Sequence, residues 1–328
     1  MSALSDQLVT FAILAYLIAM ISHAVEFALA NARKVAVAAP VRELVGAGVG
    51  STGGTVDEPV APVAPVAPPR PDRSAARAAL AGRIAAWLTT LAAALHLGAV
   101  VTRGIAAERM PWGNMYEFVL TVTWIGVAAW LVVLWKQPSL RRLGLFLTLV
   151  MVLLLAFAEL KLYVQVVPLM PALQSYWFII HVSTIIFASG IFLLGVVPAA
   201  AYLMRAGWEQ GRRSFPYTLA RRLPAAAGLE RLTFTTHAFA FPIFTFAVIA
   251  GAIWAEAAWG RAWGWDPKET WAFISWVVYA GYLHARATPS VKRNVATWIA
   301  VVGFLTMLMN LFGVNFFFTG LHSYAGVN

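Results

Sequence analysis

The chain has 328 residues, of which 61% are hydrophobic and only 12% are charged. Soluble domains carry roughly 25% charged residues, so this composition excludes an ordinary water-soluble fold and indicates the lipid bilayer as the solvent. Cysteine is absent, which excludes disulfides, thiolate metal sites and cysteine nucleophiles within the chain.

Eight apolar stretches are long enough to form membrane-spanning helices, for which about 20 residues suffice. The first is too long to be a removable signal peptide, and it lacks a small-residue cleavage site. The sequence therefore predicts an all-α, polytopic bundle of about eight transmembrane helices, at residues 9–30, 79–102, 116–135, 143–160, 176–204, 236–257, 271–286 and 294–314.

The Lys and Arg residues indicate how these helices are oriented. If the N-terminus faces outward and the helices alternate, most of the 24 basic side chains fall on cytoplasmic segments. The exceptions on the outer side are Arg103, Arg109, Lys161, Arg261 and Lys268. Because cytoplasmic loops carry an excess of basic residues, we expect both termini outside. The net charge of +10 then reflects topology and not nucleic-acid binding.

Residues 32–77 are rich in Ala, Val and Pro and contain the near repeat VAP at 60–67. Such a segment is neither apolar enough to span a membrane nor patterned enough to pack, so we expect a disordered cytoplasmic linker. It divides the chain into an N-terminal transmembrane helix, residues 1–31, and a main bundle of seven helices, residues 78–328.

The most informative segment is WGRAWGWDPKETW at 259–271, in the predicted outer loop between the sixth and seventh helices. Its tryptophans, Trp259, Trp263, Trp265 and Trp271, provide flat apolar surfaces near the membrane interface. One interpretation is an aromatic belt, which is common where helices meet lipid headgroups. The other is a platform for a planar ligand, and composition alone leaves the two open.

The same segment contains a helix start. Asp266, Pro267 and Glu269 have the spacing of N-cap, N1 and N3, which predicts a capping box with proline where its missing N–H costs nothing. On this interpretation Asp266 is a helix cap and not an acid or base, and replacing it costs about 1 kcal/mol of helix stability.

Histidines supply further candidates, because an ionisable group inside a membrane marks a functional site by default. His181 lies about one turn inside the outer end of the fifth predicted helix, and His322 follows the last helix on the same side. Two neutral imidazoles beside an aromatic platform are what a bis-histidine haem iron requires. His284 lies roughly 20 Å below the outer start of the seventh helix, at 1.5 Å per residue, so it belongs to a second site.

The other histidines are weaker candidates. His96, in the second helix, is a candidate participant whose alternative is a helix–helix hydrogen bond. We expect His23 and His237 to be structural or interfacial, with Glu26 as a candidate partner of His23.

Glu117 lies at an outer helix start, where an acidic side chain favours the helix dipole. If the planar ligand is haem, the sharper hypothesis is that Glu117, or an arginine such as Arg103 or Arg109, engages its propionates or a partner protein. Arginine suits this role because its fork matches a carboxylate.

Together these motifs resemble the CcsA/ResC family of system II cytochrome c biogenesis, a branch of the haem-handling membrane proteins named for the WWD motif. The segment 259–271 fits that motif without a gap, and further matches occur in order along the chain. They are GNMYE at 113–117, Trp177 with IHV at 180–182, YLH at 282–284, GVN at 313–315 and GLHSY at 320–324. The resemblance covers about residues 79–328.

The resemblance implies a haem b (Fe-protoporphyrin IX) site. His181 and His322 fall where the family places the two outer axial ligands, and the Trp segment with Asp266 falls where it holds the porphyrin. His284 falls at the family's transmembrane histidine, which receives haem on its way outward. The implied function is to carry haem to the outer face of the bacterial plasma membrane and present it to the Cys-x-x-Cys-His motif of apocytochrome c.

The resemblance also implies partners. A ResB-type (CcsB) membrane protein is expected to supply the other intramembrane ligand, and cytochrome c haem lyase activity is expected in complex with it. Apocytochrome c is the implied substrate protein. A thioredoxin-like protein that reduces its thiols is implied indirectly.

Other classes of membrane protein are alternatives to this interpretation. A permease predicts an internal repeat with paired discontinuous helices, which the sequence lacks. A b-type cytochrome predicts histidine pairs at matching depth on two helices, which His181, His284 and His322 do not all satisfy. A CcmC- or CcmF-type haem chaperone of the other biogenesis route shares the Trp motif. The single Trp segment near the C-terminus, YLH at 282–284 and the overall length favour the system II member.

Overall fold

The structure, a computed structural model, describes residues 1–29, 73–169 and 171–321. All regular elements in these ranges are helical, which confirms the predicted all-α fold. The main helices are α1 (Ser2–Leu29), α2 (Arg73–Ala107), α3 (Met115–Lys136), α4 (Gly144–Phe157), α5 (Tyr176–Glu209), α6 (Ala226–Trp259), α7 (Pro267–Ala287), α8 (Arg293–Leu308) and α9 (Val314–Phe317). Short turns of 3₁₀ or π-helix extend some of them, namely η1 (Pro138–Leu143), η2 (Ala158–Leu162), η3 (Pro171–Leu173), η4 (Tyr217–Arg222) and η5 (Met309–Gly313).

Within the described ranges, seven helical segments are long and apolar enough to cross a membrane. They correspond to the predicted helices other than the seventh, which confirms a multi-pass membrane bundle. The remaining long helix, α7, has 21 residues but is not among the seven, since Lys268, Glu269 and Arg286 near its ends lower its hydropathy. It packs against α6 and α8 as an eighth member of the bundle.

The first helix is an integral part of the bundle, because α1 packs along α2 and α4. The hydroxyl of Ser5 donates to the carbonyl of Ala99 at 2.9 Å, and Glu26 pairs with Arg141 at 2.7 Å. We expected the linker to separate this helix from the main bundle. The contacts of α1 with α2 and α4 show instead that it packs within the bundle. Residues 73–77, expected in the linker, form the start of α2, and the rest of the linker lies outside the described residues.

Buried histidines join helices inside the bundle. The Nε2 of His96 lies 2.9 Å from the carbonyl oxygen of Leu120, and its Nδ1 lies 3.4 Å from the hydroxyl of Tyr16. This buried ring therefore connects α1, α2 and α3, in the manner of the helix–helix hydrogen bond weighed above. His23 lies 3.6 Å from Glu26, the partner considered for it.

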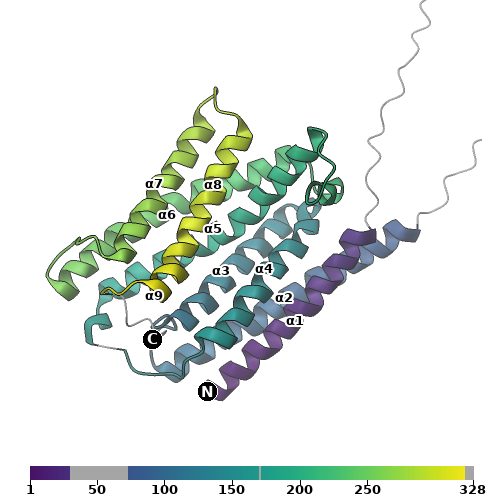
Figure 1. Cartoon of the computed structure of the whole chain (residues 1–328). Helices are drawn as coiled ribbons and strands as arrows, with labels where there is room; N and C mark the ends of the chain where they lie inside the picture. Colours follow the sequence, from purple (N-terminus) through teal and green to yellow (C-terminus); the bar gives the residue numbers. More distant parts are fainter. Residues whose placement is uncertain (30–72, 170, 322–328) are drawn as a thin grey trace, which may run out of the picture.

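Figure 1 shows the long helices running side by side, with α1 and α2 on one flank and α7 and α8 on the other. Central helices α3 and α5 approach closely at Gly190, where an added Cβ would lie 2.6 Å from the side chain of Ile125. Small residues permit such approaches in membranes. The start of α1, the start of α7 and the short helix α9 lie at one end, called here the Trp-loop end after residues 259–271.

We predict that Glu26→Gln lowers the free energy of unfolding by about 1–3 kcal/mol, because it leaves the Arg141 guanidinium without its buried counter-charge. Thermal unfolding in detergent measures the change. The matched control is Glu209→Gln, which breaks an exposed pair with Arg205 and should cost less than about 0.5 kcal/mol. Equal losses in the two variants would contradict a special role for the ion pair between α1 and η1.

Candidate functional site

A cavity of about 240 Å³ lies at the Trp-loop end, between α3, α5, α6, α7 and α8. Its volume is just below the range of roughly 300–1,000 Å³ that is usual for small-molecule sites. The lining is mostly apolar, and its aromatic part includes Phe118, Phe178, Phe244, Trp254, Trp259 and Trp263. Such a wall suits a flat apolar ligand.

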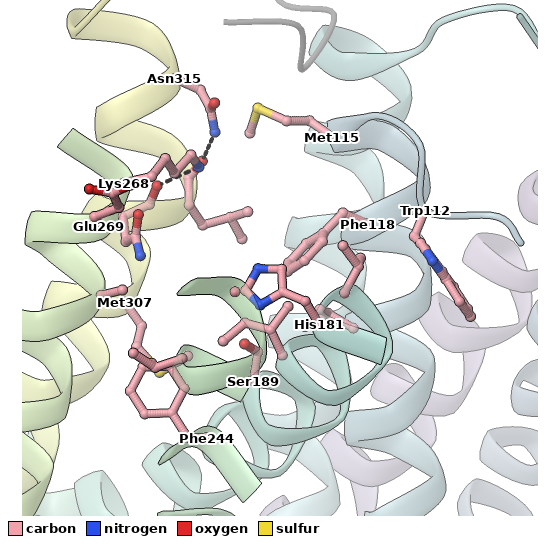
Figure 2. Close-up of a pocket in the computed structure, with 18 of the residues that line it drawn as sticks. Trp112, Met115, Phe118, His181, Ser189, Phe244, Lys268, Glu269, Met307 and Asn315 are labelled. Atoms are coloured by element: carbon pink, nitrogen blue, oxygen red, sulfur yellow. Dashed lines mark hydrogen bonds between the residues drawn. The ribbon is translucent and has the colours of Figure 1, made fainter. Parts of the chain in front are cut away.

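His181 projects from α5 into this cavity (Figure 2). Helix α5 begins after Ser175, whose hydroxyl caps the helix by accepting from the backbone N–H of Trp177, so His181 falls in the second turn. Its Nδ1 lies 2.8 Å from the carbonyl oxygen of Ala247 on α6. Because a carbonyl can only accept, Nδ1 carries the hydrogen and Nε2 carries the lone pair that a metal ligand needs.

Two residues of α6, Trp254 and Gly251, hold the imidazole of His181 in place. Its ring stacks on Trp254 with centroids 5.9 Å apart and planes 20° apart. Gly251 provides the room, because a Cβ added there would lie 2.7 Å from the ring. The hydrogen bond, the stacking and the absence of a side chain at 251 together fix the orientation of the ring.

The Trp loop is organised by the carboxylate of Glu269. This carboxylate accepts the backbone N–H of Gly264 at 2.8 Å and that of Asp266 at 3.0 Å, and it pairs with Arg261 at 3.3 Å. The capping box predicted from the sequence is therefore confirmed. It fixes the path of the loop over the cavity.

Asp266 is the N-cap of α7 and is buried. Its Oδ2 accepts from the N–H of Lys268 at 3.3 Å, and its Oδ1 accepts from the N–H of Leu321 at 2.8 Å. The second bond ties the chain that follows α9 to the loop. Asp266 therefore caps a helix and joins two distant segments at the Trp-loop end.

The four tryptophans of the loop divide by position. Trp259 and Trp263 line the cavity, whereas Trp265 and Trp271 do not. Trp265 is 64% exposed and adopts φ +58°, a left-handed conformation that is strained for a bulky residue. It makes an edge contact with Trp263 at 5.7 Å. The loop thus places two rings inside and holds a third at the rim.

Glu117 is the centre of a buried ion cluster and does not line the cavity. Its carboxylate accepts from Arg103 at 3.2 Å, from Arg109 at 2.7 Å and from the backbone N–H of Gly113 at 2.8 Å. The neighbouring residues 112–115 do line the cavity. Glu117 is therefore placed to hold residues 112–115 in position at the cavity wall.

Asp6 extends this cluster to α1. Its carboxylate lies 3.5 Å from Arg103, and the hydroxyl of Tyr163 donates to it at 2.9 Å. That hydrogen bond, together with burial, raises the pKa of the Tyr163 phenol. The cluster ties α1, α2, α3 and the segment after η2 together beside the cavity.

His284 lies in the last turn of α7 and is exposed on the outside of the bundle. It is about 25 Å from the first residue of α7 at 1.5 Å per residue, so it does not share the cavity with His181. His322 lies outside the described residues. His237 is buried near the opposite end, with Nδ1 2.7 Å from the carbonyl oxygen of Thr233.

Residues of this site that the sequence did not reveal include Trp254, Gly251 and the cavity-lining Lys268. Trp254 lies outside the Trp segment, and its stacking on His181 depends on how α5 and α6 are aligned. Lys268 lies within the segment, but its sequence position indicates only a positive charge on the outer side. Among the described residues, no group of three or more His, Asp or Glu is arranged to hold a bare metal ion.

Comparison with known proteins identifies the class. Residues 112–322, which contain most of the cavity lining and the Trp loop, match the family described as Cytochrome C assembly protein. The protein is thus a multi-pass membrane protein of cytochrome c assembly.

Relatives narrow the identification. The chain is 35% identical to the cytochrome c biogenesis protein CcsA of Guillardia theta, over 69% of this chain and 80% of the relative. It is 32% identical to CcsA of Trieres chinensis, over 74% and 86% of the two chains, and 31% identical to CcsA of Gloeobacter violaceus, over 69% and 82%. The chain belongs to the CcsA family and is a membrane component of system II cytochrome c biogenesis.

We predict that Gly251→Ala lowers the free energy of unfolding by about 1–3 kcal/mol, because the new methyl group meets the imidazole of His181 at 2.7 Å. Thermal unfolding of the purified protein measures this change. Gly281→Ala is the control, since nothing lies within 4 Å of its added Cβ and alanine favours a helix by about 0.5–1 kcal/mol. A loss at 281 equal to that at 251 would count against the close packing of His181.

Proposed function

We propose that this protein carries haem b to the outer face of the bacterial plasma membrane and presents it to the Cys-x-x-Cys-His motif of apocytochrome c. The observation that carries the proposal is the imidazole of His181, with its lone-pair nitrogen Nε2, in an aromatic cavity beneath the Trp loop. A flat apolar macrocycle with an axial iron ligand fits such a lining. Cytochrome c biogenesis in the named relatives supports haem as the cargo.

The outer site in this proposal uses His181 and His322 as the two axial ligands, beneath the loop that contains Trp259, Trp263, Trp265, Asp266 and Trp271. Trp259 and Trp263 would contact the porphyrin from inside the cavity, whereas Trp265 lies at its rim. The geometry of His181 supports its part directly. The hydrogen bond from Leu321 to Asp266 supports the part of His322, because it brings the residue that precedes His322 in sequence to the Trp loop.

The second site uses His284, where haem enters on its way outward. Its exposure on the outside of α7 supports this role, because an exposed imidazole is accessible to a ligand from a neighbouring protein. We propose a ResB-type (CcsB) membrane protein as that neighbour. His284 and its partner would bind haem first, and His181 and His322 would receive it.

Covalent attachment then needs few groups from this chain. The histidine of the apocytochrome motif replaces one protein ligand of the iron. Each cysteine thiol adds across one vinyl group, so that a C–S bond forms, the thiol hydrogen passes to the other vinyl carbon, and no oxidant or reductant is consumed. The chain contributes positioning, as a haem lyase in complex with its partner. A thioredoxin-like protein keeps the substrate thiols reduced.

The proposed orientation places both termini and the Trp loop outside. It is supported by the basic residues at the opposite end of the bundle, in η1, in η4 and around the turn between α7 and α8, where Arg286, Lys292 and Arg293 lie. We keep residues 32–72 as our proposal for a cytoplasmic linker between the N-terminal helix and the haem-handling bundle, because residues 73–77 of the expected linker belong to α2.

We predict that haem co-purifies with the protein expressed together with its ResB-type partner, and that His181→Ala, His322→Ala and His284→Ala each lower its amount. The reason is the loss of one axial nitrogen, so added imidazole should restore the wild-type absorption spectrum. His96→Gln is the control, because both nitrogens of His96 have partners away from the cavity. If the wild-type complex carries no haem, the proposal fails.

We predict that Trp265→Ala slows haem attachment to apocytochrome c severalfold while the bound haem is retained. Trp265 lies exposed at the rim and does not line the cavity, so it is placed to contact the incoming substrate protein. The rate of covalent attachment and the haem content are measured on the same sample. Trp298→Ala, at an exposed tryptophan on α8, is the control. A parallel loss of haem would assign Trp265 to binding instead.

A further inference from the structure

An ammonium group enters the apolar cavity from the first turn of α7. Among the described residues that line the cavity, Lys268 is the one lysine or arginine (Figure 2). Its Nζ donates to the carbonyl oxygen of Asn310 at 2.8 Å, and it has no ion pair within the described part of the chain. A cation in apolar surroundings is costly unless an anion accompanies it.

The two nearby carboxylates hold other groups, although the charge of Asp266 also acts on Lys268. Glu269 accepts two backbone N–H groups and pairs with Arg261. Asp266 accepts the backbone N–H groups of Lys268 and Leu321 as a helix cap. The ammonium of Lys268 therefore faces the cavity beside groups that fix the loop.

Asn310 adds a second polar group at the same place. It lies in the π-helical turn η5, a type of helix irregularity that often occurs at functional sites, and it lines the cavity. Its side-chain oxygen is buried and has no hydrogen-bond partner in the described residues. Because the oxygen and nitrogen of an amide are assigned by their partners, this side chain can turn its N–H₂ toward an acceptor.

We propose that Lys268, assisted by Asn310, binds a carboxylate of the ligand held in the cavity. The inference rests on the proposed function, in which that ligand is haem and the carboxylates are its propionates. It replaces the earlier hypothesis for Arg103 and Arg109, since the guanidinium groups of both are engaged by Glu117 and neither residue lines the cavity.

The contact has a specific consequence for orientation. An axial bond from His181 holds the iron but leaves the macrocycle able to turn about that bond. A carboxylate fixed at Lys268 sets this rotation, because it anchors one edge of the ring on the α7 side of the cavity. The vinyl groups are then held in one direction for the incoming thiols. Lys268 is thus a specificity-determining residue for a dicarboxylate macrocycle.

The test compares binding of haem and of haem dimethyl ester, in which both propionates are esterified, to the purified complex with its partner. Wild type is expected to bind haem about tenfold more tightly than the ester. Lys268→Met should bind both ligands at the level of the ester, and Lys268→Arg should keep the preference. Lys161→Met, at an exposed lysine in η2, is the control and should bind as wild type does.

Each other outcome has a distinct meaning. An unchanged preference in Lys268→Met, or an equal loss of both ligands, overturns the inference while leaving the proposed function intact. Failure of wild type to bind either ligand overturns the proposed function itself. His181→Ala should weaken both ligands alike and so separates axial binding from carboxylate binding. Loss of bound lipid phosphate from Lys268→Met, with the haem preference unchanged, would assign the anion to a lipid headgroup and also overturn the inference.

Discussion

The carboxylate of Glu269 is the interaction on which the Trp-loop end depends. A loop at the edge of a membrane must satisfy backbone N–H groups that a regular helix would pair, and each group left unpaired costs about 1–3 kcal/mol when buried. Glu269 satisfies two of them and holds Arg261. The same bonds direct Trp263 into the cavity and bring Lys268 into the first turn of α7. The same hydrogen bonds therefore determine both the stability of the start of α7 and the shape of the cavity.

In this cavity, the groups that would give a ligand its affinity differ from the groups that would fix its orientation. Its lining is mostly apolar and aromatic, so the ligand proposed for it would gain its binding free energy chiefly from buried apolar area, which does not change when a flat ring rotates. His181 and Lys268 interrupt this wall from different helices, α5 and α7. Two polar contacts on opposite elements define an orientation that area alone leaves undetermined.

Hydropathy predicted the membrane helices well, because each must satisfy its backbone alone and is recognisable from local sequence. The capping box was equally local, with Asp266 and Glu269 three residues apart. The contacts that could not be predicted from the sequence are those that depend on how neighbouring helices are aligned along one another. The place of Trp254 beneath His181 depends on how α5 lies on α6, and the docking of α1 depends on contacts such as Ser5 with Ala99, which are 94 residues apart.

Helix α7 is the long helix that is not apolar enough to be counted among the candidate membrane spans, and it contains several candidate functional residues. Polar side chains are expensive in a membrane and persist where they are paired or used. In α7 the first turn holds the cap and Lys268, and the last turn holds His284 and Arg286, which pairs with Glu230 on α6. The middle of the helix, by contrast, buries Ser275 and Tyr279 against its neighbours. The charged side chains of α7 and His284 lie only near its two ends, about 25 Å apart, so one rigid helix would join the two proposed haem sites.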